Sequence, residues 1–237
     1  ISYVLKNFFK RKLKINYFLA IILQINPKLV ITQYDNSAEF HLISKILLNK
    51  NIRTIAAQGA IRTINNTKSL KKNFFINEYL VFSNYEKNFY TKNNFEVKKF
   101  YPVGSIKSAA ALDFFEKNSS DLSKKYDICI ISELIKVKNL IDEKYMIMLR
   151  NFIQNIKNFA KQKKLKVIIA GAGNKNSEIA KIENDFYNEI FGENDYEIDH
   201  SDKEYYPSYK NILKSKLVVG THSTLIREAL GLNKKVF

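Results

Sequence analysis

The sequence predicts an α/β fold with two parallel-sheet domains that face a cleft, and three observations support this prediction. Short apolar runs of strand length alternate with longer segments of helical periodicity through most of the 237 residues. The runs are rich in Ile and Val and lack polar alternation, as is typical of strands covered by helices on both faces. The alternation is interrupted once, at 105–125, and then begins again, which indicates two Rossmann-like units.

The first expected domain comprises residues 1–105 and forms the acceptor side. Its predicted strands are the apolar runs at 28–33, 52–59, 78–83 and 96–105. Its predicted helices have apolar residues at helical spacing or stand between two such strands, at 17–25, 37–50 and 84–93.

A connector with a helical piece is expected at 106–125, followed by a second domain at 126–237. Its predicted strands are 126–132, 165–173, 216–220 and a last one that begins at "KKVF". Its predicted helices are 140–163, 175–191, a short one within 205–215 and one at 223–231. Because the chain starts at Ile1 and stops within a strand at Phe237, we expect both domains to be partial.

The composition favours a folded, basic protein with anionic partners. Apolar residues make up 46% of the chain, which argues against intrinsic disorder, and the formal net charge is +16. Such a charge suits phosphorylated substrates, nucleic acid or an anionic membrane surface. The lysines are scattered rather than clustered with aromatic residues, so a solvated lysine-rich surface is the alternative and a nucleic-acid partner is not expected.

The cysteine and histidine content excludes several kinds of site. Cys129 is the single cysteine and lies within the apolar run "YDICIIS", so we expect a buried thiol, no internal disulfide and a reducing compartment. The histidines at 41, 200 and 222 are too dispersed for a metal cluster, and no metal is expected. His41 is interpreted as a packed histidine.

The first 25 residues contain the longest early apolar stretch, "YFLAIILQI" at 17–25. It is shorter than the roughly 20 residues that span a bilayer, and no small-residue cleavage site follows it. We therefore expect a cytoplasmic protein. The basic flank "FFKRKLK" makes residues 1–25 a candidate for peripheral contact with an anionic inner membrane.

Polar and small residues follow four of the predicted strands, at the edge where parallel sheets bind ligands. The most informative corner is "VGTHSTLIRE" at 219–228. Ser223 and Thr224 are good helix N-cap residues, and a helix that begins there directs its N–H groups at a diphosphate. Glu228 is one turn further along and could accept hydrogen bonds from ribose hydroxyls. The alternative is an ordinary capped helix with a solvated Glu228.

The other corners carry weaker signals. "GAGNKN" offers Gly171 and Gly173, but position 176 is Asn where a dinucleotide fingerprint requires glycine, so NAD binding is not expected. In "QYDNSAEF", one carboxylate could act as general base toward an acceptor hydroxyl. The alternative is that Asp35 or Asn36 caps the helix that starts near Ser37.

These segments together identify a resemblance. "PKLVITQYDNSAEFHLISK", "IAAQGAIRT", "YPVGSIKSA", "YDICIIS" and above all "VVGTHSTLIREALGLNKKVF" resemble bacterial surface-carbohydrate biosynthesis proteins similar to GT-B-fold glycosyltransferases, over about residues 27–237. The resemblance implies a donor side that binds the nucleotide-activated sugar, at Gly171, Gly173, His222, Ser223, Thr224, Arg227 and Glu228. It implies catalytic candidates at Asp35 and Glu39 and acceptor-side residues at Asn36, Gln58 and Gly59.

The resemblance also implies the reaction. We expect transfer of a sugar from a nucleotide-activated donor to a cell-surface polysaccharide or glycolipid acceptor, with no cofactor and no metal, because the helix dipole and basic side chains can stabilise a leaving diphosphate. The alternatives are a polyol-phosphate transferase or a nucleotide-sugar epimerase on the same fold, or a non-catalytic basic binding or scaffold protein.

Overall fold

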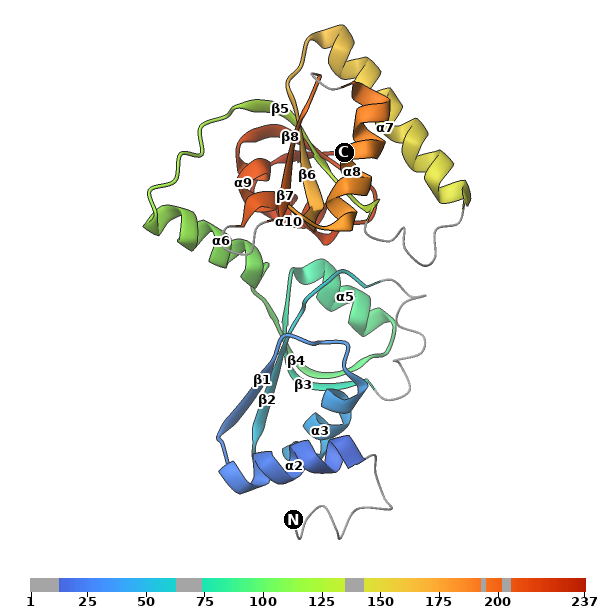
Figure 1. The fold of residues 1–237 in the computed structure, drawn as a ribbon. Coiled ribbons are helices and arrows are strands. Elements are labelled where there is room, and N and C mark those ends of the chain that lie inside the picture. The colour runs from blue at the N-terminus through green and yellow to red at the C-terminus, as the bar shows by residue number, and fades with distance from the viewer. Residues whose placement is uncertain (1–12, 63–73, 135–142, 193–194, 202–205) are drawn as a thin grey trace. The chain divides into compact units, whose positions relative to one another are not determined.

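The protein divides into two compact units, Ile1–Ile106 and Lys107–Phe237. A computed structural model describes residues 13–62, 74–134, 143–192, 195–201 and 206–237. Each unit contains one sheet in which every strand pair is parallel (Figure 1). The predicted α/β class with two parallel-sheet units is therefore confirmed.

The first unit contains a four-stranded sheet with the strand order β1-β2-β3-β4. The strands are β1 (Leu29–Thr32), β2 (Arg53–Ala57), β3 (Phe75–Val81) and β4 (Glu96–Pro102). The helices are α2 (Leu13–Ile25), α3 (Ala38–Leu48) and α5 (Asn84–Lys92). The register pairs Thr32 with Ala56 and Ala57 with Leu80, so the carboxyl ends of the first three strands lie at one edge.

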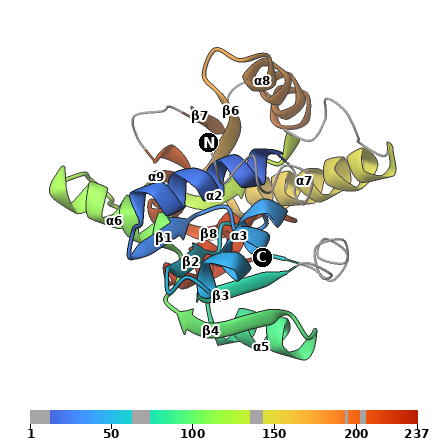
Figure 2. The same ribbon diagram turned by 90° about the horizontal axis from the view of Figure 1, so that it is seen from below.

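Two apolar clusters hold the helices of this unit to its sheet. Tyr79 of β3 and Tyr90 of α5 lie in an aromatic cluster with Phe74 and Phe95. Leu19 of α2 packs with Leu47 of α3 in a second cluster, and Figure 2 shows these helices near each other. His41 is fully buried and its Nδ1 lies 3.2 Å from the carbonyl oxygen of Phe75, which confirms it as a packed histidine. Burial lowers the pKa of its imidazole.

The second unit contains a five-stranded sheet with the strand order β7-β6-β5-β8-β9. The strands are β5 (Tyr126–Ile131), β6 (Val167–Asn174), β7 (Glu197–Ser201), β8 (Ser215–Val219) and β9 (Lys235–Val236). The helices are α6 (Ile106–Lys117), α7 (Glu143–Lys163), α8 (Glu178–Phe191), α9 (Pro207–Leu213) and α10 (Thr224–Gly231).

Alternate residues of β5 show how both faces of this sheet are covered. Ile128 and Ile130 lie in a cluster with α7 and α8 residues, whereas Cys129 and Ile131 lie in a cluster with residues of α9 and α10. Figure 1 shows the two helix pairs around the sheet. Cys129 is buried as predicted, and burial raises the pKa of its thiol to about 12.

The structure corrects the sequence prediction at several elements. Strand β7 at Glu197–Ser201 was not predicted, and β3 begins at Phe75 rather than at residue 78. Helix α6, within the expected connector, packs through Ala111 and Phe115 against Tyr209 of α9. Residues 140–142 of the predicted helix and the basic stretch at 1–12 lie outside the described residues. Within the described residues, no helix is both long and apolar enough to cross a bilayer.

Candidate functional site

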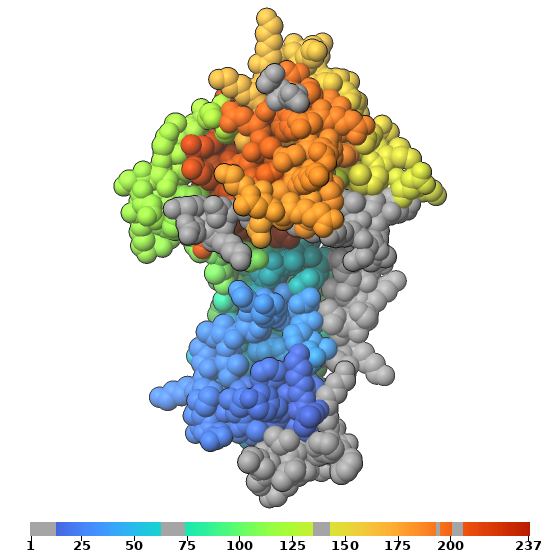
Figure 3. Space-filling model, viewed as in Figure 1, coloured from blue at the N-terminus to red at the C-terminus, as the bar shows by residue number. Residues whose placement is uncertain are grey.

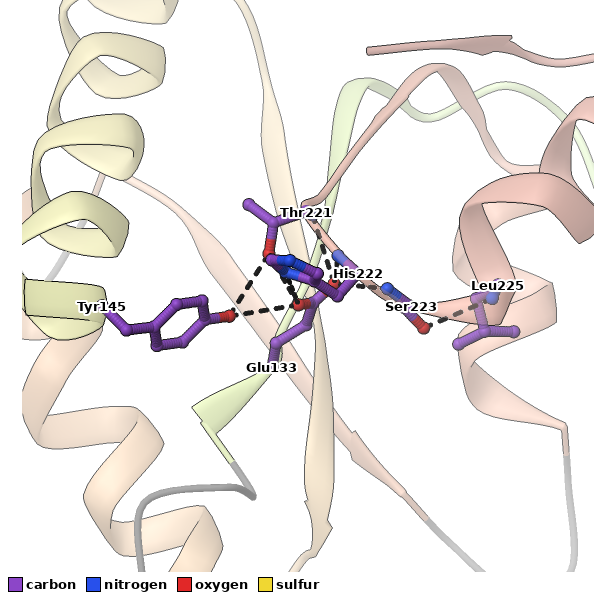
Figure 4. Close-up of polar contacts among 6 residues, drawn as sticks. All are labelled: Glu133, Tyr145, Thr221, His222, Ser223 and Leu225. Atoms are coloured by element: carbon purple, nitrogen blue, oxygen red, sulfur yellow. Dashed lines mark hydrogen bonds and ion pairs between the residues drawn. The ribbon is translucent and has the colours of Figure 1, made fainter. Parts of the chain in front are cut away.

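The candidate site lies where the strand order of the second sheet reverses. Strands β5 and β8 are hydrogen-bonded neighbours, with β6 and β7 on one side and β9 on the other. In open parallel sheets, ligands bind beyond the carboxyl ends of the strands at such a reversal. Because Ile130 pairs with Val219, the residues that follow β5 and β8 meet at this point. Figure 4 shows these residues.

Glu133, just after β5, is the centre of the site. Its Oε1 accepts hydrogen bonds from the backbone N–H groups of Thr221 at 3.2 Å, His222 at 2.7 Å and Ser223 at 2.7 Å. Its Oε2 accepts the hydroxyl of Thr221 at 2.6 Å and that of Tyr145 on α7 at 3.3 Å (Figure 4). The two oxygens of this buried carboxylate therefore accept five hydrogen bonds from the protein, which satisfies their acceptor capacity.

The hydrogen bonds to Glu133 decide its charge. Burial alone raises the pKa of a carboxyl group, but here the hydrogen bonds from Thr221 and from the three backbone N–H groups outweigh it and lower the pKa of Glu133. The side chain is therefore a carboxylate at neutral pH. The loop after β8 folds around a negative charge that the protein itself supplies.

This arrangement limits which groups of the loop could reach a diphosphate, and the diphosphate site near Ser223 and Thr224 stays a prediction. Ser223 is the N-cap of α10, as expected, and its Oγ accepts the N–H of Leu225 at 3.3 Å. Thr224 is the first residue of that helix. However, the N–H groups of residues 221–223 are not open to a ligand, because Glu133 accepts all of them. The exposed group of this loop is the ring of His222.

The other two residues of the motif, Arg227 and Glu228, differ in burial. Glu228 is buried and accepts the hydroxyl of Tyr209 at 2.9 Å, so the alternative of a solvated Glu228 is wrong. Arg227 is exposed on α10. A contact of Glu228 with ribose stays a prediction.

Gly171 and Gly173 are required by packing. A Cβ on Gly173 would lie 2.7 Å from the backbone nitrogen of Ala180, and one on Gly171 would lie 2.5 Å from Nδ1 of His200. The fully buried Glu183 accepts the N–H groups of Ala172 and Gly173 at 2.9 and 3.0 Å. Their expected position beside a nucleotide stays a prediction.

Asp35 is the centre of a second polar cluster, in the first unit. Its Oδ1 accepts Arg62 Nη2 at 2.6 Å and the N–H of Gly59 at 3.2 Å, and its Oδ2 accepts the Tyr79 hydroxyl at 2.6 Å. Burial raises the pKa of Tyr79 well above its usual value. Gln58, also buried, donates to the carbonyl of Ala60 and accepts the N–H of Phe82.

Helix α3, which follows β1, is not capped by either of the two residues that the sequence analysis considered. Ser37, rather than Asp35 or Asn36, caps α3, and its Oγ accepts the N–H of Phe40 at 3.2 Å. Glu39 lies in the first turn and accepts the Ser37 hydroxyl at 3.1 Å. Asn36 is exposed. The catalytic roles of Asp35 and Glu39 and the acceptor-side role of Asn36, Gln58 and Gly59 stay predictions.

Sequence reasoning missed the groups that bind these loops, which are Arg62, Glu133, Tyr145 and Glu183. Glu133 carried a usable signal, because it is an acid close behind an apolar strand and at the edge where ligands bind. Tyr145 and Glu183 lie on helices, and nothing in the sequence around them indicated their role. Within the described residues, no group of three or more His, Cys, Asp or Glu side chains could hold a metal ion.

Comparisons with known proteins agree with this architecture. Residues 141–237 match the model of a family described as "putative O-antigen biosynthesis protein". The structure is similar to that of UDP-GlcNAc 2-epimerase from Neisseria meningitidis bound to UDP-GlcNAc, with a TM-score of 0.59 and 16% identity over 94% of this chain and 62% of that one. No curated protein matches the sequence.

Two more solved structures resemble the chain. A "putative UDP-N-acetylglucosamine 2-epimerase" from Listeria monocytogenes has a TM-score of 0.61 and 12% identity over 94% of this chain and 59% of that one. A glycosyltransferase from Rickettsia africae has a TM-score of 0.49 and 13% identity over 96% and 62%. The chain thus spans about three fifths of these proteins. The predicted resemblance to GT-B-like surface-carbohydrate biosynthesis proteins is confirmed for the fold and by the family model.

Proposed function

We propose that the protein binds a nucleotide-activated sugar at the carboxyl edge of its second sheet and transfers the sugar to a cell-surface polysaccharide or glycolipid. One observation carries this proposal: the loop at Thr221–Ser223 and the start of α10 lie at the strand-order reversal between β5 and β8. Parallel sheets bind nucleotides at this position. The family match over residues 141–237 includes this loop and its description concerns O-antigen biosynthesis, which supports a sugar substrate.

A nucleotide-sugar epimerase is the second candidate. The two structures above with TM-scores over 0.5 are described as 2-epimerases of UDP-N-acetylglucosamine, and one of them binds UDP-GlcNAc. The two reactions differ in what they need. An epimerase changes the sugar of the nucleotide without a second substrate, whereas a transferase releases the nucleotide only when an acceptor is present. A polyol-phosphate transferase with a CDP-linked donor would also require an acceptor.

The proposal is tested first by thermal unfolding of the 237-residue chain with UDP, GDP, CDP, CMP, dTDP and NAD. A ligand at about 100 times its dissociation constant stabilises a protein by roughly 2.7 kcal/mol, which raises the unfolding temperature by several degrees. We expect a selective shift with one nucleotide and none with NAD. A folded protein that responds to no nucleotide would overturn the proposal in favour of a scaffold role.

Analysis of the products then separates the candidates. The nucleotide sugar whose base gives the shift is incubated without an acceptor, and then with membrane glycolipid extracts. Conversion to an isomeric nucleotide sugar without acceptor would establish the epimerase. Release of nucleotide that depends on the extract is expected for the transferase. We propose that neither cofactor nor bound metal takes part, so activity should persist in the presence of EDTA.

A further inference from the structure

The hydrogen-bond network around Glu133 determines which nitrogen of His222 carries a proton. The Thr221 hydroxyl lies 2.6 Å from Glu133 Oε2, and His222 Nδ1 lies 3.1 Å from that same hydroxyl oxygen (Figure 4). A hydroxyl has one hydrogen to donate. Since a carboxylate has none, the Thr221 hydrogen points to Glu133 at 2.6 Å rather than to the Tyr145 hydroxyl at 3.3 Å, and the Thr221 oxygen can only accept from His222. Nδ1 of the neutral ring must therefore carry the proton.

The tautomer with Nδ1–H leaves a lone pair on Nε2. The His222 side chain is 58% exposed, and no other described residue hydrogen-bonds to its Nε2. The ring lies beside that of Tyr145, with the centroids 5.8 Å apart, so it is held from the side as well as through Nδ1. An acceptor of fixed direction therefore projects from the loop at the strand-order reversal.

We propose that His222 contacts the substrate through this unprotonated Nε2 and accepts a hydrogen bond from a hydroxyl group of the sugar nucleotide. Thr221 and Glu133 are positioning residues that hold the ring in its tautomer. The inference rests on the proposed function for the identity of the ligand, but the tautomer is a property of the free protein. A fully ionised phosphate has no hydrogen to donate, so a neutral His222 selects hydroxyl groups over phosphate oxygens.

The tautomer is tested by nitrogen-15 NMR of the free 237-residue chain with labelled histidine. The chain has three histidines, and the signals that are lost in His222→Phe are those of His222. We expect the Nδ1–H form of His222 in the wild type and in Thr221→Ser, which keeps the hydroxyl. Thr221→Val keeps the branched shape without the hydroxyl, and there the Nε2–H form should gain population. A wild type in the Nε2–H form, or a Thr221→Val spectrum like that of the wild type, would overturn the positioning.

The contact is tested by calorimetric titration, at a pH where pyrophosphate is fully ionised, with two probes, UDP-N-acetylglucosamine and pyrophosphate, of which only the first then carries hydroxyl groups. His222→Phe should weaken UDP-N-acetylglucosamine binding about three- to tenfold, as for one lost hydrogen bond, and leave pyrophosphate binding unchanged. The reverse pattern would show a phosphate contact. If UDP-N-acetylglucosamine binds equally well to both proteins, the inference fails alone; if no nucleotide sugar binds the wild type, the proposed function fails as well.

The pH dependence gives an independent readout. Among the described residues, Glu133 and Tyr145 are the titratable groups in contact with His222. Hydrogen bonds lower the pKa of Glu133 and burial raises that of Tyr145, so both keep one charge near neutral pH. A protonated Nε2 cannot accept a hydrogen bond, so UDP-N-acetylglucosamine affinity should fall as pH is lowered through the His222 protonation seen by NMR. An affinity that rises instead would indicate an imidazolium–phosphate contact and overturn the proposal. His222→Phe should remove this pH dependence.

Discussion

Three buried carboxylates have the same role at the residue scale. Asp35, Glu133 and Glu183 each lie near the carboxyl ends of parallel strands. Asp35 and Glu133 accept N–H groups from loops that follow strands, whereas Glu183 accepts those of Ala172 and Gly173, in the part of β6 where the register with β7 is irregular. These N–H groups lie outside the regular strand pairing, and a buried unpaired donor costs free energy. A carboxylate satisfies several of them at once, so it fixes the loop at the edge where a ligand would bind.

Glu133→Gln should therefore destabilise the second unit in a pH-dependent way. An amide accepts more weakly than a carboxylate, so we expect a loss of about 1–3 kcal/mol at pH 7, measured by urea unfolding. The folded-state pKa of Glu133 is lowered, so its contribution is present above the unfolded-state value of about 4.3 and is lost as pH falls through the folded-state pKa. The difference from wild type should thus shrink toward pH 3. Glu116→Gln, at an exposed position, should show no such difference.

Gly173→Ala should destabilise the fold, because the new Cβ would lie 2.7 Å from the backbone nitrogen of Ala180, which cannot move away as a side-chain end could. We expect a loss of about 1–3 kcal/mol in thermal or urea unfolding. Gly231→Ala is the matched control, since a Cβ at this end of α10 meets no atom within 4 Å and should leave stability unchanged or improve it. Equal effects of the two substitutions would contradict this packing role of Gly173.

At the scale of the element, a single serine determines where α3 begins. Ser37→Ala removes the oxygen that accepts the N–H of Phe40 and should cost about 1 kcal/mol in unfolding free energy. Asn36→Ala is the control: it tests the alternative in which the neighbouring residue is the cap, and we expect a change within about 0.5 kcal/mol. A larger loss from Asn36→Ala than from Ser37→Ala would refute the assignment of the cap.

Asp35 connects the ends of β1, β2 and β3 through Gly59, Arg62 and Tyr79. Asp35→Asn leaves the guanidinium of Arg62, whose side chain is only 16% exposed, without its counter-ion. We expect a loss of about 3–5 kcal/mol, measured by chemical unfolding. Adding Arg62→Met should restore part of it, because the unpaired charge is then gone. Lost turnover without lost stability would instead favour the catalytic role of Asp35.

The elements themselves could largely be predicted from the sequence, because their apolar runs and helical periodicity are local signals. Strand β7 was missed since "EIDHS" carries alternate acids and no apolar run, as suits an edge strand whose hydrogen bonds go to β6 alone. The start of β3 was missed because Phe75 and Ile76 follow a polar stretch. Each miss concerns a strand whose place is set by its neighbour rather than by its own composition.

At the scale of the whole molecule, the site depends on a contact between distant parts of the chain. Glu133 and Thr221 are 88 residues apart, and only the pairing of β5 with β8 brings them together. The sequence predicted the loop at 221–223 between a strand and a helix, as the structure has it, and its role in binding stays a prediction. It could not show that an internal carboxylate accepts its N–H groups, because strand order is not visible in local periodicity.

The charge and surface of the molecule bear on where it works. The net charge is +16, and Lys14 lies in the first turn of α2, which follows the basic residues Lys10, Arg11 and Lys12 in the sequence. One stripe of this helix, with Ile15 and Leu19, packs in the core of the first unit, whereas Leu13, Tyr17 and Ile25 are 57–69% exposed. Figure 3 shows α2, in dark blue, at the surface. Exposed apolar side chains on a helix of a basic protein lead us to propose this face of α2 for contact with an anionic membrane surface.

Tyr17→Glu should therefore weaken binding of the chain to vesicles that contain anionic lipid, measured by co-sedimentation at several salt concentrations. It replaces an exposed aromatic side chain of α2 by a charge that the lipid surface repels. Phe159→Glu is the matched control, because it changes the net charge equally at an exposed aromatic position on α7. If both substitutions weaken binding equally, net charge alone governs it and α2 is no docking face. If only Tyr17→Glu does so, and binding of the wild type falls with salt as for a screened charge interaction, the face of α2 contacts the lipid.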